Sequence, residues 1–128
     1  MAYAALGLIA LNALVHLYIL WMEMFAWETR GPLVFGDLFE GNAAEMFAAT
    51  APMAANQGLY NGFLAAGLIW ALTIREPRWR FNVATCFLSF VAIAGLYGAA
   101  TVTATTLIVQ TLPATLAFGA LWLSARRR

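Results

Sequence analysis

Four long apolar segments constrain this chain more than any other feature of its sequence. They cover roughly residues 2–27, 54–74, 81–103 and 105–123, and each reaches the ~20 residues that an α-helix needs to cross a bilayer. Only 10% of the residues are charged, whereas about a quarter are charged in a soluble domain. The sequence therefore predicts one all-α transmembrane domain over residues 1–128, an antiparallel four-helix bundle without a separate soluble domain.

The arginines predict the orientation of the four spans. Arg75, Arg78 and Arg80 flank the connection between the second and third spans, and three more arginines occupy positions 126–128. Positively charged connections remain in the cytoplasm, so we expect both termini to be cytoplasmic. The connection over residues 28–53 is mostly acidic and should be a long outer loop. Its charged residues are Glu28, Arg30, Asp37, Glu40 and Glu45.

The first apolar segment is too long for a signal peptide and has no positive charge before it, so we expect it to remain as a helix. The outer connection holds three turn signals, and residues 43–49 could form a short helix with Asn42 as its N-cap and Glu45 at its third position. Its apolar side chains favour a segment on the membrane surface or a lid over the bundle, with a plain interfacial loop as the alternative. The turn signals are Gly31-Pro32, Gly36-Asp37 and Gly41-Asn42, and the apolar residues are Phe35, Phe39, Met46 and Phe47.

A polar stripe follows the first span. With Asn12 at zero on a helical wheel, His16, Glu23 and Trp27 fall at about 40°, 20° and 60°. A carboxylate inside a span costs ~2.5–3.5 kcal/mol at mid-bilayer and usually faces a bundle interior or a cavity. Two other interpretations stay open. Glu23 could be an interfacial carboxylate that reaches the headgroups, and His16 could form an interhelical hydrogen bond that only fixes packing.

The second span begins with four large polar residues, Asn56, Gln57, Tyr60 and Asn61, which cover an arc of roughly 140° on a helix. Gly58 and Gly62 lie on another face. Because small residues let two helix backbones approach closely, we expect this glycine face to pack against a neighbouring helix rather than lipid.

The last two spans add Tyr97, near the outer surface, and Gln110, in the outer half of the fourth span. Gly95 and Gly98 favour a close approach of another helix to the third span. Pro113 has no backbone N–H, so it should leave the carbonyl of Val109 without its helical partner and kink the fourth helix.

The predicted topology places these polar residues together in the outer half of the membrane. Glu23 should lie ~5 Å, and His16 ~15 Å, below the outer end of the first span. We therefore expect one pocket that opens outward or toward the outer leaflet, with His16 and Glu23 as candidate acid/base residues. The candidate ligand-binding residues are Asn12, Asn56, Gln57, Tyr60, Asn61, Tyr97 and Gln110.

The segment Asn56 to Ala65 (NQGLYNGFLA) resembles the signature of a bacterial family of small four-span membrane proteins, catalogued only as a domain of unknown function. The resemblance covers essentially the whole chain. It implies a shared four-helix fold in the bacterial cytoplasmic (inner) membrane, and it implies no activity or catalytic residues. The other residues that carry it are His16, Glu23-Met24-Phe25, Gly95 to Val102 (GLYGAATV), Gln110 and Pro113-Ala114.

Three classes of function fit these features. The first is a membrane enzyme or binding protein for an apolar or amphipathic small molecule, with Glu23 or His16 as acid/base. The second is a small proton-coupled exporter, and the third is an accessory or structural subunit whose polar cluster holds the bundle together. A net charge of +1, with no basic surface expected beyond the arginines that flank the spans, argues against nucleic acid.

Few cofactors fit the sequence. His16 and Glu23 are seven residues apart, unlike the i,i+4 spacing of a metal pair on a helix. A metal, or a haem with His16 as its axial ligand, is weakly supported. Cys86 is the single cysteine, so an intrachain disulfide is excluded. The partners expected are the lipid bilayer and a small molecule, and a homo-oligomer stays open.

Overall fold

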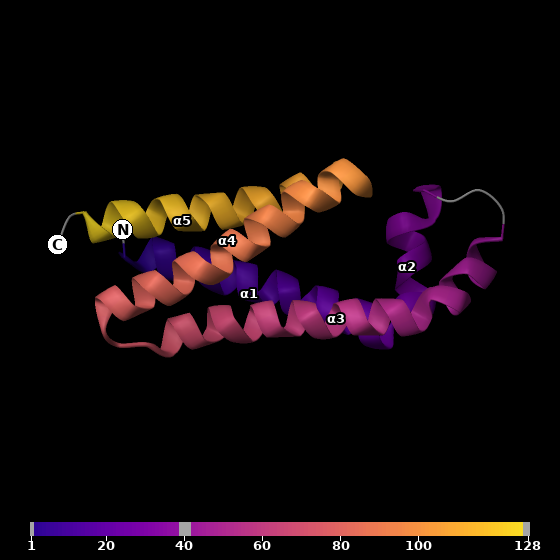
Figure 1. Cartoon of the computed structure of the whole chain (residues 1–128), viewed down its shortest axis with the longest axis horizontal. Helices are drawn as coiled ribbons and strands as arrows, with labels where there is room; N and C mark the ends of the chain where they lie inside the picture. Colours follow the sequence, from indigo (N-terminus) through magenta and orange to yellow (C-terminus); the bar gives the residue numbers. More distant parts are fainter. Residues whose placement is uncertain (1, 39–41, 127–128) are drawn as a thin grey trace. The chain divides into compact units, whose positions relative to one another are not determined.

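The computed structural model describes residues 2–38 and 42–126, and almost all of them are helical (Figure 1). The described residues contain no strand, so the predicted all-α class is confirmed. The predicted roles of Phe39, Glu40, Gly41, Arg127 and Arg128 lie outside the described residues. The helices are α1 (Ala2–Phe25), α2 (Trp27–Phe35), α3 (Ala43–Thr73), α4 (Pro77–Thr101) and α5 (Leu112–Ala125), with a 3-10 turn at Gly36–Leu38 and a π-helical turn at Leu107–Thr111.

Three segments of the described chain are long and apolar enough to cross a membrane: Tyr3–Phe25, Pro77–Thr101 and Leu107–Ala125. Their length and composition are those of a multi-pass membrane protein, as the sequence predicts. The second predicted span lies in α3, which is not among these three segments. The amides of Asn56, Gln57 and Asn61 lower the mean hydropathy of this part of α3, although its 31 residues are more than long enough to span a bilayer.

The first apolar segment does not form one helix from residue 2 to 27, as the sequence predicts, because the chain bends at Ala26. Ala26 has φ −135° and ψ 18°, which are not helical values, although its N–H still donates to the carbonyl of Met22 at 3.1 Å. Trp27 therefore begins α2. The predicted position of Trp27 on the polar stripe of the first span is therefore wrong, since a helical wheel holds only along an unbroken helix.

The predicted long outer loop, residues 28–53, is largely helical, because α2 and the 3-10 turn occupy its first part and α3 begins at Ala43. Asn42 is the N-cap, as predicted: its Oδ1 accepts the backbone N–H of Glu45 at 3.4 Å. The short helix expected over residues 43–49 is the first part of α3. Seven alanines between positions 43 and 55 favour this continuation, and Pro52 lies inside the helix.

The chain divides into two compact units. The first consists of Met1–Val15 and Leu64–Arg128, and the second of His16–Phe63. The first unit has a buried core to which α1, α3, α4 and α5 all contribute. Its most buried side chains include Ile9, Leu68, Leu88, Val91 and Ala117.

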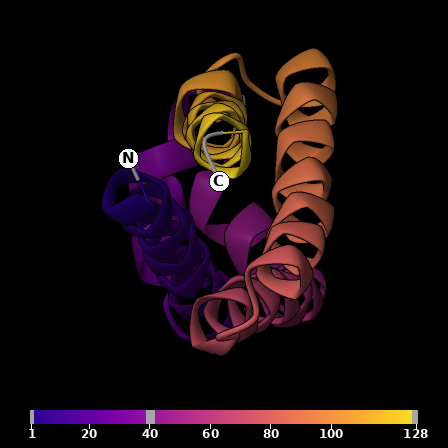
Figure 2. The ribbon, with the colours of Figure 1, turned by 90° about the vertical axis from the view of Figure 1, so that its left-hand side faces the viewer.

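The α3–α4 connection lies at the same end of the first unit as the first turn of α1 and the last turn of α5 (Figures 1 and 2). The helix after this connection starts at Pro77, four residues before the predicted span. Pro77 suits the first helical position, and the Glu76 carboxylate accepts the backbone N–H of Arg78 at 2.9 Å and that of Trp79. The dipeptide Glu76-Pro77 is therefore the start signal that the hydropathy pattern does not contain.

The irregularity predicted at Pro113 is present as a π-helical turn just before it. The backbone N–H of Leu112 donates to the carbonyl of Leu107, five residues earlier. This turn packs closely on α4: a Cβ placed on Gly95 would lie 2.9 Å from both Gln110 Cβ and the backbone nitrogen of Thr111. Gly95 therefore permits the close helix approach that the sequence predicts, and Gln110 lies at this contact.

Candidate functional site

In the second unit, α1 and α3 make a close contact at Gly58. A Cβ placed there would lie 2.7 Å from Met24 Cγ, 3.0 Å from Glu23 Cβ and 3.1 Å from the carbonyl oxygen of Leu20. One turn later, a Cβ on Gly62 would meet Leu20 Cδ1. The prediction that the Gly58 and Gly62 face packs against a neighbouring helix is confirmed, and the neighbour is α1.

This contact brings the predicted carboxylate to a predicted amide. Asn61 Nδ2 donates to Glu23 Oε2 at 2.9 Å and to the backbone carbonyl of Gln57 at 3.1 Å. The Gln57 carbonyl thus orients the amide toward Glu23. Among the described residues, no donor reaches the other carboxylate oxygen, Oε1. Both side chains are half-buried.

A second cluster in this unit joins α2 to the first turns of α3. Trp27 Nε1 donates to Thr50 Oγ1 at 3.0 Å, and the ring of Trp27 lies 5.0 Å from that of Phe47 and 5.8 Å from that of Phe35. Gly31 is buried against this cluster, since a Cβ there would lie 2.6 Å from Phe47 Cε1. Helix packing therefore buries Phe47 and half-buries Phe35, whereas Leu33, Val34, Leu38 and Met53 stay exposed. Because the described part of this segment is helical, the plain-loop alternative is wrong for it.

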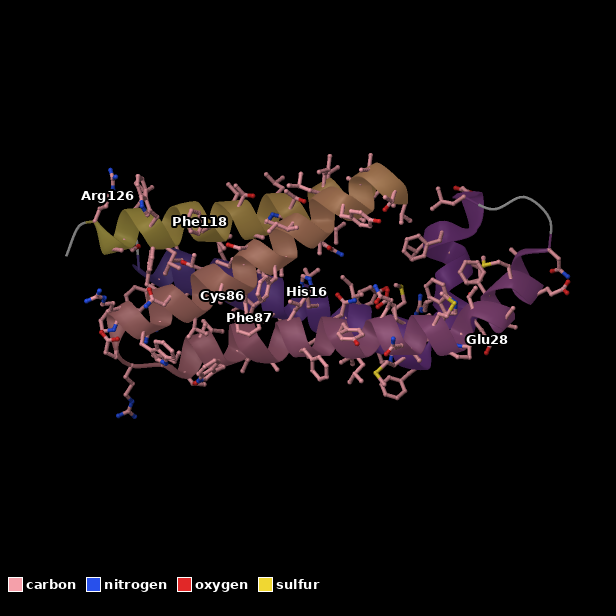
Figure 3. All side chains as sticks on the ribbon, viewed as in Figure 1. His16, Glu28, Cys86, Phe87, Phe118 and Arg126 are labelled. Atoms are coloured by element: carbon pink, nitrogen blue, oxygen red, sulfur yellow. The ribbon has the colours of Figure 1, made fainter. Side chains whose placement is uncertain are left out.

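The remaining candidates occupy different environments. Asn12 and His16 are both only 1% exposed on α1, and Asn12 Nδ2 donates to the carbonyl of Leu8 at 2.8 Å. Figure 3 shows His16 in the middle part of α1. On α3, by contrast, Asn56, Gln57 and Tyr60 are exposed.

The last two candidates, Tyr97 and Gln110, belong to the first unit. The Tyr97 side chain is exposed and that of Gln110 is half-buried. The structure thus brings Glu23 and Asn61 together, while the convergence of the whole candidate set on one pocket stays a prediction.

Sequence reasoning missed the residues that surround the pair. Leu20 and Met24 form the α1 side of the contact, and the Trp27–Thr50 hydrogen bond holds the next helix in place. The spacing of Gly58 and Gly62 predicts that some helix comes close, but it carries no information about which residues of that helix are met. Within the described residues, no group of three or more His, Cys, Asp or Glu side chains could hold a metal ion.

The family described as "Protein of unknown function (DUF1304)" matches residues 10–122. The chain is a member of this family. The matched range contains Glu23, Asn61 and every other candidate residue of the sequence analysis, and it confirms the resemblance to a family catalogued as a domain of unknown function. No curated protein and no solved structure matches this member of the family.

Proposed function

We propose that this protein is an antiparallel four-helix bundle in the bacterial cytoplasmic membrane, with both termini in the cytoplasm. α3 supplies the second of the four spans, which is the one that is not among the three most apolar segments. At 1.5 Å per residue it is roughly 46 Å long, so it can cross the ~30 Å hydrocarbon core with its first turns outside. Asn42 and Glu45, at the start of α3, are exposed, which fits a helix end in water.

We propose further that the Glu23–Asn61 pair is part of a site that binds or transforms an apolar or amphipathic small molecule. The observation that carries this proposal is the 2.9 Å hydrogen bond between Asn61 and a carboxylate whose second oxygen has no donor among the described residues. A carboxylate in an apolar helix needs partners, and the protein supplies a donor for one oxygen. A hydroxyl or N–H of a ligand could donate to the other.

The surroundings of the pair suit an apolar ligand with one polar group. Leu20 and Met24 flank Glu23 on the α1 side. On α3, Tyr60 and Phe63 are both exposed and lie edge to face, with ring centroids 5.9 Å apart. Leu20 and Met24 thus offer apolar surface next to a proton acceptor, whereas Tyr60 and Phe63 lie on a face of α3 turned away from Gly58 and α1. In a reaction, Glu23 would exchange the proton and Asn61 would keep its carboxyl group in place.

A structural role for the pair is the second candidate, and the close contact at Gly58 favours it. In that case the hydrogen bond would join α1 to α3, and the open oxygen would simply face lipid headgroups or water. A substitution that keeps the hydrogen bond but removes the ionisable group separates the two functions.

The experiment uses full-length protein purified from membranes in a mild detergent, with bound small molecules identified by mass spectrometry. Glu23→Gln keeps an oxygen that can accept from Asn61 but removes the carboxylate. Glu28→Gln is the matched control, because Glu28 is an exposed glutamate on the neighbouring α2. We expect an apolar compound to be retained by the wild type and the control, and reduced at least tenfold in Glu23→Gln, with all three equally folded. Identical bound compounds in all three proteins would reject the binding site and leave the structural role.

A further inference from the structure

The first unit contains a cavity of about 310 Å³, and none of the candidate site residues lines it. It is lined by residues from the beginning of α1, the beginning of α4 and the end of α5. Figure 2 views the unit from the end at which these three segments lie. Its size is at the lower limit of ordinary ligand pockets. Its walls combine apolar side chains with cationic and hydroxyl groups, among them Leu6, Phe81, Leu121, Arg78, Arg80 and Ser124.

Two arginines line the cavity, and a hydrogen bond restrains one of them. Arg80 is half-buried, and its Nε donates to the carbonyl of Ile74 at 2.7 Å, which holds the guanidinium group at the wall. Arg78 is exposed and lines the same cavity. The nearest acid in the sequence, Glu76, caps the helix by accepting backbone N–H groups and interacts electrostatically with Arg78, but it does not line the cavity.

Two further groups refine this picture. The hydroxyl of Ser124 is buried and has no hydrogen-bond partner among the described residues, so it can still donate to a ligand. Arg126, by contrast, stacks on the ring of Trp122 at 3.6 Å from its centroid and is not part of the cavity wall (Figure 3). The cationic wall is therefore made by the two arginines of α4.

An apolar interior beside two guanidinium groups matches an amphiphile with an anionic head. Guanidinium groups bind phosphate through paired hydrogen bonds, and basic pockets between membrane helices bind the headgroups of anionic lipids. We propose that this cavity binds an anionic phospholipid. Its phosphate lies against Arg78 and Arg80, and its glycerol and the first part of an acyl chain lie against Leu6, Phe81 and Leu121. This inference does not depend on the function proposed for Glu23 and Asn61.

The test titrates full-length protein in dodecyl maltoside with dihexanoyl phosphatidylglycerol and follows the rise in unfolding temperature. Parallel titrations use dihexanoyl phosphatidylcholine and inorganic phosphate. Arg78→Gln removes one cationic group of the wall. Arg75→Gln is the matched control, because Arg75 is an exposed arginine of the same end that does not line the cavity. Ala125→Phe fills the cavity from an exposed position and changes no charge.

We expect phosphatidylglycerol to stabilise the wild type and Arg75→Gln alike, with an apparent Kd about fivefold weaker for Arg78→Gln. Ala125→Phe should weaken binding as well, which keeps the proposal testable if Arg78→Gln does not fold. Equal weakening by Arg75→Gln and Arg78→Gln would show general attraction to a basic surface and overturn the proposal. An equal effect of phosphatidylcholine would also overturn it. Inorganic phosphate that binds as tightly as the lipid would reject the acyl contacts and hence the lipid as the ligand.

Discussion

Replacing Gly58 by alanine should destabilise the protein, although alanine favours a helix more than glycine does. The new Cβ would lie 2.7 Å from Met24 Cγ, 3.0 Å from Glu23 Cβ and 3.1 Å from the carbonyl oxygen of Leu20. Ordinary contacts between carbon atoms are about 3.5–4.0 Å. The Met24 side chain can rotate away. The Leu20 carbonyl is part of the α1 backbone and the Glu23 Cβ is bonded to it, so neither atom can move independently of the helix. α1 and α3 must therefore separate by a few tenths of an ångström.

The magnitude follows from two opposing effects. Overpacking of a close contact costs about 1–3 kcal/mol, and the higher helix propensity of alanine returns up to about 1 kcal/mol. We therefore expect Gly58→Ala to lower the free energy of unfolding by about 1 kcal/mol. Gly7→Ala is the control, because Gly7 is helical and exposed and a Cβ there meets nothing within 4 Å. The stability of Gly62→Ala should lie between those of Gly7→Ala and Gly58→Ala, since the new Cβ meets only the flexible end of the Leu20 side chain.

The assay is unfolding of full-length protein by SDS titration in mixed micelles, with helicity followed by circular dichroism. The expected order of stability is Gly7→Ala above Gly62→Ala above Gly58→Ala. If Gly58→Ala were as stable as Gly7→Ala, α1 and α3 would not be in close contact at this glycine, and the geometry that holds Asn61 against Glu23 would be refuted.

Two further predictions concern the ends of the helices. In a variant with Cys86 replaced by serine, Asp37→Cys should react with a membrane-impermeant maleimide on intact cells, and Arg127→Cys only after permeabilisation; the reverse pattern would contradict the orientation. Two backbone N–H groups, chiefly that of Arg78, lower the pKa of the Glu76 carboxyl below its ordinary 4.5. Because the folded pKa is the lower one, this stabilisation is present above pH 4.5 and lost as the pH falls through the folded pKa. The wild type should therefore lose more stability than Glu76→Gln on acidification below pH 4.5, and parallel pH profiles of thermal unfolding would count against the cap.

The hydropathy of the sequence predicts the helices well because apolar length depends on local composition. All four predicted segments are helical over most of their length. The boundaries differ where a backbone or capping effect acts. Ala26 bends the first segment, and the Glu76 carboxylate starts α4 early. The predicted outer loop is helical from Ala43 because its alanines favour helix. α2 contains no alanine, and Trp27 packs it against Thr50 and Phe47 of α3.

The candidate site shows a similar limit. A helical wheel assigns Glu23 and Asn61 to polar faces, so both residues could be identified from the sequence. Their pairing depends on how deeply Gly58 sits against Leu20 and Met24, and this depth is a property of two helices together. Asn56, four residues from Tyr60 and five from Asn61, lies on the same predicted arc but is exposed. The sequence therefore identifies the members of a polar face without identifying which of them meets another helix.

The π-helical turn at Leu107–Thr111 changes which side chains of this segment face α4. In an α-helix, residues five positions apart are turned by about 140° and point to different sides. Here Thr106 Oγ1 donates to the carbonyl of Gly95 at 3.1 Å, and Thr111 Oγ1, five residues later, donates to that of Ala92 at 3.3 Å. The wider turn places both hydroxyls on the side that faces α4, whereas an α-helix would separate them. Residues five positions apart in this segment therefore bond to carbonyls that are three positions apart in α4. Deleting one residue from this turn would restore α-helical winding but remove one of the two hydrogen bonds to α4. The extra residue of the π-helical turn therefore sets the register between this segment and α4.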